Sequence, residues 1–84
     1  MNSITQFYIV EIKQDAQGEY EHIVHWAWDT DPDIARQKAE STYHSVLAAA
    51  AVSDTMSHAA ILFSTDGFPI LNQCYKHAAA SAEE

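Results

Sequence analysis

Four kinds of residue are scarce in this chain of 84 residues, which holds one cysteine, two glycines, two prolines and four basic side chains. A single cysteine excludes a framework of internal disulfides, and this indicates a reducing compartment. Twelve acidic residues and a net charge of −8 argue against direct binding to nucleic acid, because Lys and Arg must neutralise the phosphates. No stretch approaches the roughly 20 apolar residues of a membrane span, and the N-terminus does not resemble a signal peptide. We therefore expect a cytoplasmic protein that has no contact with membranes.

Apolar residues make up 48% of the chain, and this proportion favours a folded domain over a disordered chain. A domain of this size buries only about 60% of the surface of its unfolded chain, so association with a second copy would add stability. We expect one α+β domain over residues 1–77 and a flexible tail over residues 78–84.

The periodicity of the apolar residues predicts the order ββαββ. Two stretches rich in β-branched and aromatic residues, 4–13 and 19–28, flank a turn that ends at Gly18 and form a hairpin. Apolar residues at steps of three and four then predict an amphipathic helix over residues 32–52 with Thr30 as its N-cap. A second hairpin, residues 56–64 and 69–76, follows around an Asp-Gly turn.

A helix of this length returns the chain along the sheet, so the third strand can pair with the first in an antiparallel sense. Antiparallel pairs are the more common kind. We therefore predict a four-stranded antiparallel sheet of order 2-1-3-4 with one helix packed on one face.

Both faces of this sheet carry apolar side chains, and a single helix can cover only one of them. We therefore expect a homodimer. The second half of the helix is apolar nearly all round, which favours the same conclusion, although Ala48 and Ala49 could also be helix formers on a solvated face. The residues predicted for the oligomer interface are Phe7, Ile9, Ile23, Ala27, Ala48, Ala49 and Val52.

A second candidate surface is acidic. Carboxylates can take the place of phosphates in a basic groove of a protein partner, or they can form a solvated face with no partner. The residues predicted for partner binding are Glu11, Glu19, Glu21, Asp29, Asp31 and Asp33.

The pattern of histidines and the lone cysteine does not match a known kind of catalytic or metal site. His22 and His25 are three apart on a strand and point to opposite faces, and no paired cysteine spacing accompanies them. His58 lies in an apolar strand, where it could be a core or interface residue or a protonation switch. Cys74 reads as a small hydrophobe. We predict no enzyme activity and no cofactor.

The aromatic residues of the first hairpin allow one further possibility. They could form a stacking platform for a small planar ligand of nucleotide type, although core or interface packing explains them as well. These aromatic residues are Phe7, Tyr8, Tyr20, Trp26 and Trp28.

Several residues and short segments together resemble a group of short uncharacterised proteins of phages and mobile elements in gut Firmicutes. These are Ala39, Tyr43-His44, "LAAAAVSD", "SHAA", Asp66-Gly67 and Tyr75, and the resemblance covers most of residues 4–77. It implies a small acidic accessory protein without catalytic activity. The expected function is docking on a protein partner, with inhibition of a host nucleic-acid-binding or defence protein as one form of it.

Overall fold

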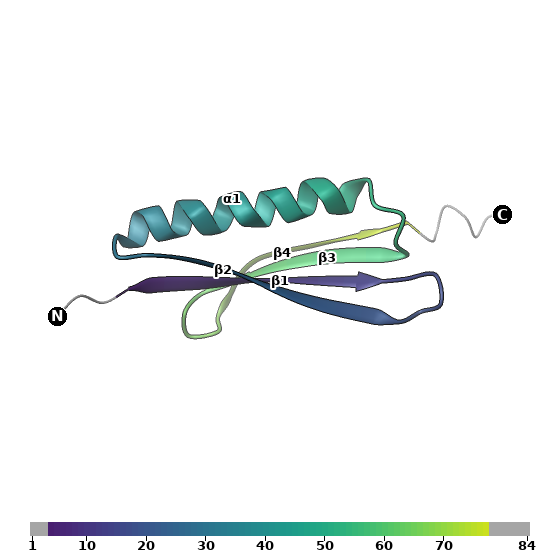
Figure 1. Ribbon diagram of the computed structural model, residues 1–84, viewed down its shortest axis with the longest axis horizontal. Coiled ribbons are helices and arrows are strands. Elements are labelled where there is room, and N and C mark those ends of the chain that lie inside the picture. Colours follow the sequence, from purple (N-terminus) through teal and green to yellow (C-terminus); the bar gives the residue numbers. More distant parts are fainter. Residues whose placement is uncertain (1–3, 78–84) are drawn as a thin grey trace.

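The structure is a computed structural model that describes residues 4–77, and these form four strands and one helix in the predicted order (Figure 1). The elements are β1 Thr5–Gln14, β2 Tyr20–Asp29, α1 Pro32–Ala51, β3 Ser57–Phe63 and β4 Pro69–Lys76. The α+β class is therefore confirmed. The tail predicted over residues 78–84 lies outside the described residues.

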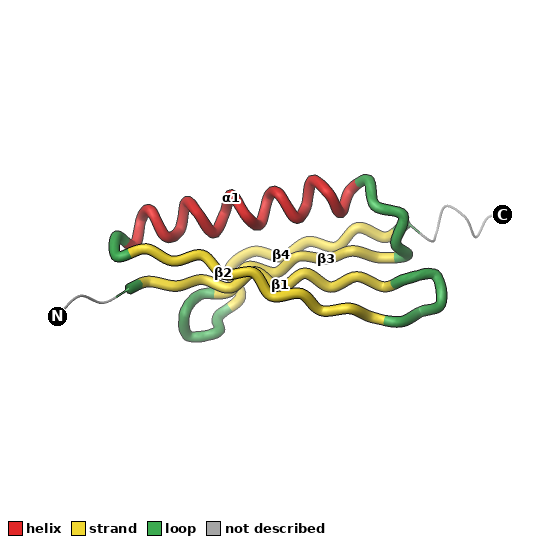
Figure 2. The backbone as a smooth tube through the Cα atoms, viewed as in Figure 1, coloured by secondary structure: helices red, strands yellow, loops and turns green. Residues whose placement is uncertain are grey.

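All three strand pairs are antiparallel and the sheet has the order β2-β1-β3-β4, as predicted. Both hairpin turns contain a glycine with φ of +87°, Gly18 and Gly67, in the region that side chains with a Cβ rarely adopt. The tube in Figure 2 shows the β1–β2 turn and the α1–β3 connection together at one end of the molecule. The β2–α1 and β3–β4 turns lie toward the other end.

The N-cap of helix α1 lies one residue later in the chain than predicted. Asp31, not Thr30, is the N-cap: its carboxylate accepts a hydrogen bond of 2.9 Å from the Asp33 amide, and Pro32 follows in the first turn. The prediction of Thr30 was wrong because an aspartate one position closer offered the same cap. No helix in residues 4–77 combines the length and the apolar character needed to cross a bilayer.

The helix covers one face of the sheet and lies mainly over β1, β2 and β3 (Figure 1). Its buried stripe contains three alanines with no exposed surface, Ala35, Ala39 and Ala50, and small side chains let the helix approach the strands closely. Ile9 and Leu62 are the largest side chains that are fully buried beneath it. The opposite face of the sheet has no element of the described chain over it.

Candidate functional site

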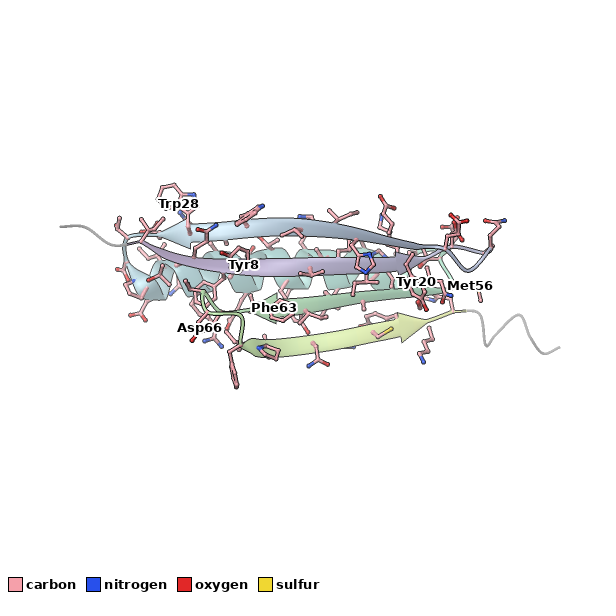
Figure 3. All side chains as sticks on the ribbon, turned by 90° about the horizontal axis from the view of Figure 1, so that it is seen from below. Tyr8, Tyr20, Trp28, Met56, Phe63 and Asp66 are labelled. Atoms are coloured by element: carbon pink, nitrogen blue, oxygen red, sulfur yellow. The ribbon has the colours of Figure 1, made fainter. Side chains whose placement is uncertain are left out.

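The open face of the sheet is the first candidate site. Its side chains follow from strand alternation, because the paired residues of neighbouring strands point to the same side. From β1 and β2 it receives Gln6, Tyr8, Val10, Ile12, Gln14, Tyr20, His22, Val24, Trp26 and Trp28, and from β3 and β4 it receives Ser57, Ala59, Ile61, Phe63, Asn72, Cys74 and Lys76. Figure 3 looks onto this face and shows Trp28, Tyr8 and Phe63 toward one end and Tyr20 toward the other.

Among residues 4–77 no carboxylate lies on this face, although the chain contains twelve acidic residues. The strands hold three of them, Glu11, Glu21 and Asp29, and all three point to the helix side. The other carboxylates of residues 4–77 lie in turns and on the helix. The strong negative charge of the chain is thus kept away from the one face that no helix covers.

Two apolar rows cross the middle of the open face, and two further large apolar side chains, Trp28 and Tyr20, lie at the ends of the edge strand β2. Trp26 and Tyr8 are cross-strand partners whose rings make an edge-to-face contact with centroids 4.8 Å apart. The next row places Val10 between Val24 and Ile61. The polar members Gln6, Gln14, Ser57, Asn72 and Lys76 lie at the strand ends or along β4. A central apolar area with a polar rim is the usual anatomy of a protein interface.

Three large side chains of this face remain mainly in solvent. Trp26 is 58% exposed, Trp28 54% and Tyr20 61%. All three come from β2, which is an edge strand and contributes most of the exposed apolar surface. Single exposed apolar side chains are ordinary, but a contiguous group of them on one face marks an interaction site.

A shallow hollow of about 430 Å³ lies at the end of the open face that is close to the β1–β2 turn. Its lining residues are Ile12, Gln14, Tyr20, Met56, Ser57, Cys74 and Lys76. Cys74 is exposed and lies on the edge strand β4. Tyr20 and Met56 are seen side by side there in Figure 3.

The predicted oligomer interface named the wrong face of the sheet. Phe7, Ile9 and Ala27 are buried beneath the helix and belong to the core of the single chain, and Ile23 is half-buried and points to the same side. Phe7 for the same reason cannot belong to a stacking platform with Trp26. Both faces alternate apolar residues, and the sequence pattern contained nothing that told which one the helix covers.

The helical part of that prediction is placed differently. Ala48 and Ala49 are exposed on the outer side of α1, and Val52 at its C-cap is 84% exposed. Their contact with a second chain stays a prediction.

The predicted acidic surface does not form one patch. Glu11 is only 8% exposed and faces the core, so it cannot take part in binding a partner. Glu19 and Glu21 lie beside the β1–β2 turn, whereas Asp29, Asp31 and Asp33 lie at the other end of β2. Glu21 and Asp29 are eight positions apart along β2, which at about 3.3 Å per residue is roughly 26 Å.

A buried polar cluster around Glu11 is the second candidate site. One carboxylate oxygen of Glu11 lies 2.5 Å from Nε2 of His58, and the other lies 2.9 Å from Nε2 of His25. His58 is 3% exposed, and its Nδ1 lies 3.2 Å from the hydroxyl of Ser53. That hydroxyl in turn contacts Thr55 at 2.7 Å. The cluster thus joins β1, β2 and β3 to the segment that follows the helix.

Burial alone would raise the pKa of Glu11, but hydrogen bonds from His25 and His58 and the positive charges of His58 and Lys13 outweigh it. The net effect holds the pKa of Glu11 below its ordinary value of 4.5. The carboxylate is therefore ionised at neutral pH and can only accept, so both histidine Nε2 atoms donate to it.

The Ser53 hydroxyl can serve either protonation state of His58. When Nδ1 is unprotonated, Ser53 donates to it, and when Nδ1 carries a proton, Ser53 accepts from it and donates to the Ala50 carbonyl at 3.2 Å. His77 also contacts that carbonyl, through Nε2 at 2.9 Å. Side chains from the segments that follow α1 and β4 thereby provide partners for the Ala50 carbonyl at the helix C-terminus.

The order Ser53, His58, Glu11 resembles the polar relay of acyl-transfer enzymes, a grouping that the sequence analysis missed. A signal for part of it was present: Glu11 continues the alternate positions of Phe7 and Ile9, which places a carboxylate on an apolar face. The contacts seen here tie the end of the helix to the sheet. No group of three or more His, Cys, Asp or Glu within residues 4–77 is arranged to hold a metal ion.

The remaining histidines lie apart from this cluster. His22 and His25 do point to opposite faces, as predicted, with His22 on the open face opposite Ile12. His44 is exposed on the helix.

None of the protein-family models, curated proteins and solved structures compared with this chain matches it. Any account of its function therefore depends on the two sites described above.

Proposed function

We propose that this protein is a non-catalytic docking module that binds another protein through the open face of its sheet. The observation that carries the proposal is the distribution of charge and apolar surface over the sheet. In a chain of net charge −8, the strands place no carboxylate on the uncovered face and present Trp26, Trp28 and Tyr20 to solvent there. Exposing such a face to water is unfavourable, and burying it against a protein surface of matching shape is favourable.

The aromatic side chains of β2 would contribute most of the binding energy of a partner on this face. Trp and Tyr are the residues most often found to dominate binding energy, because they bury a large area at little cost in side-chain entropy. Each buried Å² of apolar surface contributes about 25 cal/mol, before the costs of association are subtracted. Placing two tryptophans and a tyrosine on one edge strand therefore favours a partner that covers β2 and β1.

The test is a comparison of three immobilised baits exposed to the same cell lysate: the native protein, Trp26→Ser and Val52→Ser. Trp26→Ser removes a large apolar group from the open face. Val52→Ser is the control, because it removes an exposed apolar side chain at the C-cap of α1, outside the sheet. A protein of the lysate that binds the open face, identified by mass spectrometry, should be retained by the native and Val52→Ser baits and lost from the Trp26→Ser bait.

Salt separates this proposal from docking through the acidic residues. Contacts between exposed charges weaken as ionic strength rises, whereas burial of apolar surface does not. Retention on the open face should therefore persist in high salt. If every retained protein is released by salt and unaffected by Trp26→Ser, the open face is not the docking surface.

A small planar ligand is the second candidate, and the hollow beside Tyr20 and Lys76 is the observation that favours it. Base stacking on an aromatic ring contributes about 1–3 kcal/mol, and Lys76 could face a phosphate. A thermal-shift screen with nucleotides tests this. A nucleotide that raises the melting temperature of the native protein but not of Tyr20→Ser would support ligand binding there, and no shift with any nucleotide would dismiss it.

A further inference from the structure

We infer that the partner which covers the open face is a second copy of this chain, in a face-to-face dimer. The inference rests on the proposed docking function and names its partner. Three properties of the face support a copy over a different protein: its charge, its area and the arrangement of its rows.

The first property is the charge of the open face compared with that of the rest of the surface. Two copies of a chain with a net charge of −8 repel one another over most of their surfaces. The open face is the exception, because the charged groups that it presents are Lys76 at the rim and, when protonated, His22. A second open face therefore meets no opposing carboxylates, and the acidic turns at both ends stay in solvent. The same charge distribution gives a basic partner little to bind on this face.

The area of the face meets the lower threshold for a specific dimer interface. Four strands about 4.8 Å apart, with seven to ten residues each at about 3.3 Å per residue, give a face of roughly 550 Å² in projection. Covering two such faces removes at least about 1,100 Å² from solvent. That value exceeds the roughly 1,000 Å² that separates specific interfaces from incidental contacts, and it is close to the lower end, about 1,200 Å², of the areas buried in stable complexes.

The rows of the face suit packing of sheet on sheet. The apolar rows centred on Tyr8 and Val10 run across three strands, and the polar column of β4 borders them. Two such faces stacked about 10 Å apart would interdigitate their central side chains, as in a β-sandwich. The result is a four-layer particle with a helix on each outer side.

The experiment measures the mass of the full chain in solution by size-exclusion chromatography with light scattering. We expect the native protein to have twice the monomer mass of 9.4 kDa. Val24→Glu places a carboxylate in the central row, where Val24 is 47% exposed in the single chain. Burying two added carboxylates in one interface should weaken the dimer roughly 100-fold and shift the mass to that of the monomer.

Ala48→Glu is the matched control, since it adds the same carboxylate to the exposed side of the helix. It should leave the dimer intact. Circular dichroism shows whether Val24→Glu still folds. Val24→Thr keeps the shape and the strand preference of the residue, and it should weaken the dimer several-fold in the same sense.

Both tryptophans of the chain lie on the open face, so fluorescence provides a second measurement. Their emission should shift to shorter wavelength as the native protein is concentrated, and it should remain at longer wavelength in Val24→Glu. A dimer that Ala48→Glu breaks and Val24→Glu leaves intact would overturn the inference in favour of the helix.

The outcomes also separate this inference from the proposed function. A native protein of monomer mass at every concentration, with retention of a different protein that Trp26→Ser abolishes, overturns the dimer and keeps the docking function. A host nucleic-acid-binding or defence protein retained in this way would be such a result. A monomer that retains nothing through the open face overturns both.

Discussion

Glu11 is the residue whose position most needs a physical explanation, because it is a carboxylate among apolar core residues. Its neighbours on the same face of β1 and β3 include Ile9 and Ala60, and its loss of water is offset mainly by the two histidines next to it, with a smaller contribution from Lys13. Two charge-assisted hydrogen bonds, to His58 and His25, provide that compensation. The cluster holds the end of the helix against the strands. Removing one member leaves another buried polar group without a hydrogen-bond partner, and this costs free energy.

Replacing Glu11 by alanine should destabilise the protein by about 2–4 kcal/mol. The change leaves Nε2 of the buried His58 without an acceptor, and an unpaired buried polar group costs more than the bond itself contributes. Glu11→Gln keeps an acceptor oxygen and the side-chain volume, and we expect it to lose only about 1–2 kcal/mol. Urea unfolding of the three proteins measures both values. Equal losses for the two variants would mean that volume, rather than hydrogen bonding, is what Glu11 supplies.

The lowered pKa of Glu11 predicts a loss of stability in acid. The carboxyl has a pKa of about 4.5 in the unfolded chain and a lower pKa in the folded one. Its contribution is therefore complete above pH 4.5, and it disappears as the pH falls through the folded pKa. Asp29 and Asp66 also have lowered pKa values, but both remain in Glu11→Gln. The free energy of unfolding should thus fall more steeply below pH 4.5 for the native protein than for Glu11→Gln, and parallel curves would contradict the assignment.

At the scale of elements, the start of α1 is determined by a single side chain. Asp31→Ala removes the carboxylate that accepts from the Asp33 amide and a negative charge at the positive end of the helix dipole. We expect a loss of about 1 kcal/mol in the free energy of unfolding. Thr30→Ala is the control and should change stability by less than about 0.5 kcal/mol, because Thr30 does not cap the helix. A larger loss for Thr30→Ala would restore the cap that the sequence pattern suggested.

Strands, helix and sheet order could be predicted because each depends on local pattern and on general rules of chain connection. The two hairpins follow from Gly18 and Gly67, and the helix from apolar steps of three and four. The covered face could not be predicted in the same way. Ile9 and Val10 are adjacent and equally apolar, and it is the alanine stripe of the helix packed on Ile9 that makes one face the core.

The polar cluster was hidden from sequence reasoning for a different reason. Glu11 and His58 are 47 residues apart, and they meet only because β1 pairs with β3 in one register. A shift of one residue would turn His58 to the open face. The candidate docking face has the same origin, since the absence of carboxylates becomes visible only when the residues of all four strands are assigned to their sides.

At the scale of the whole molecule, the fold has two layers, a helix and a sheet, and only the faces that they turn toward each other are buried. The layer between sheet and helix is closed by side chains such as Ile9, Leu62 and Tyr43, whereas the outer layer of the sheet is open. Within residues 4–77 no second helix covers it. Placing all strand carboxylates on the helix side, where Glu11 is paired internally and Asp29 is paired with Lys38, leaves the open face free to be covered by another chain.

A dimer that forms through this face should make thermal stability depend on protein concentration. Two folded copies bind one another and the unfolded chains do not, so mass action stabilises the folded state as concentration rises. Each tenfold increase should raise the melting temperature of the native protein by about 3–5 °C for a domain of this size. Ala48→Glu should show the same slope, and Val24→Glu should melt at one temperature across the series. Differential scanning calorimetry over a hundredfold range of concentration measures the slopes, and a flat response of the native protein would mean that its open face is not covered by a second copy.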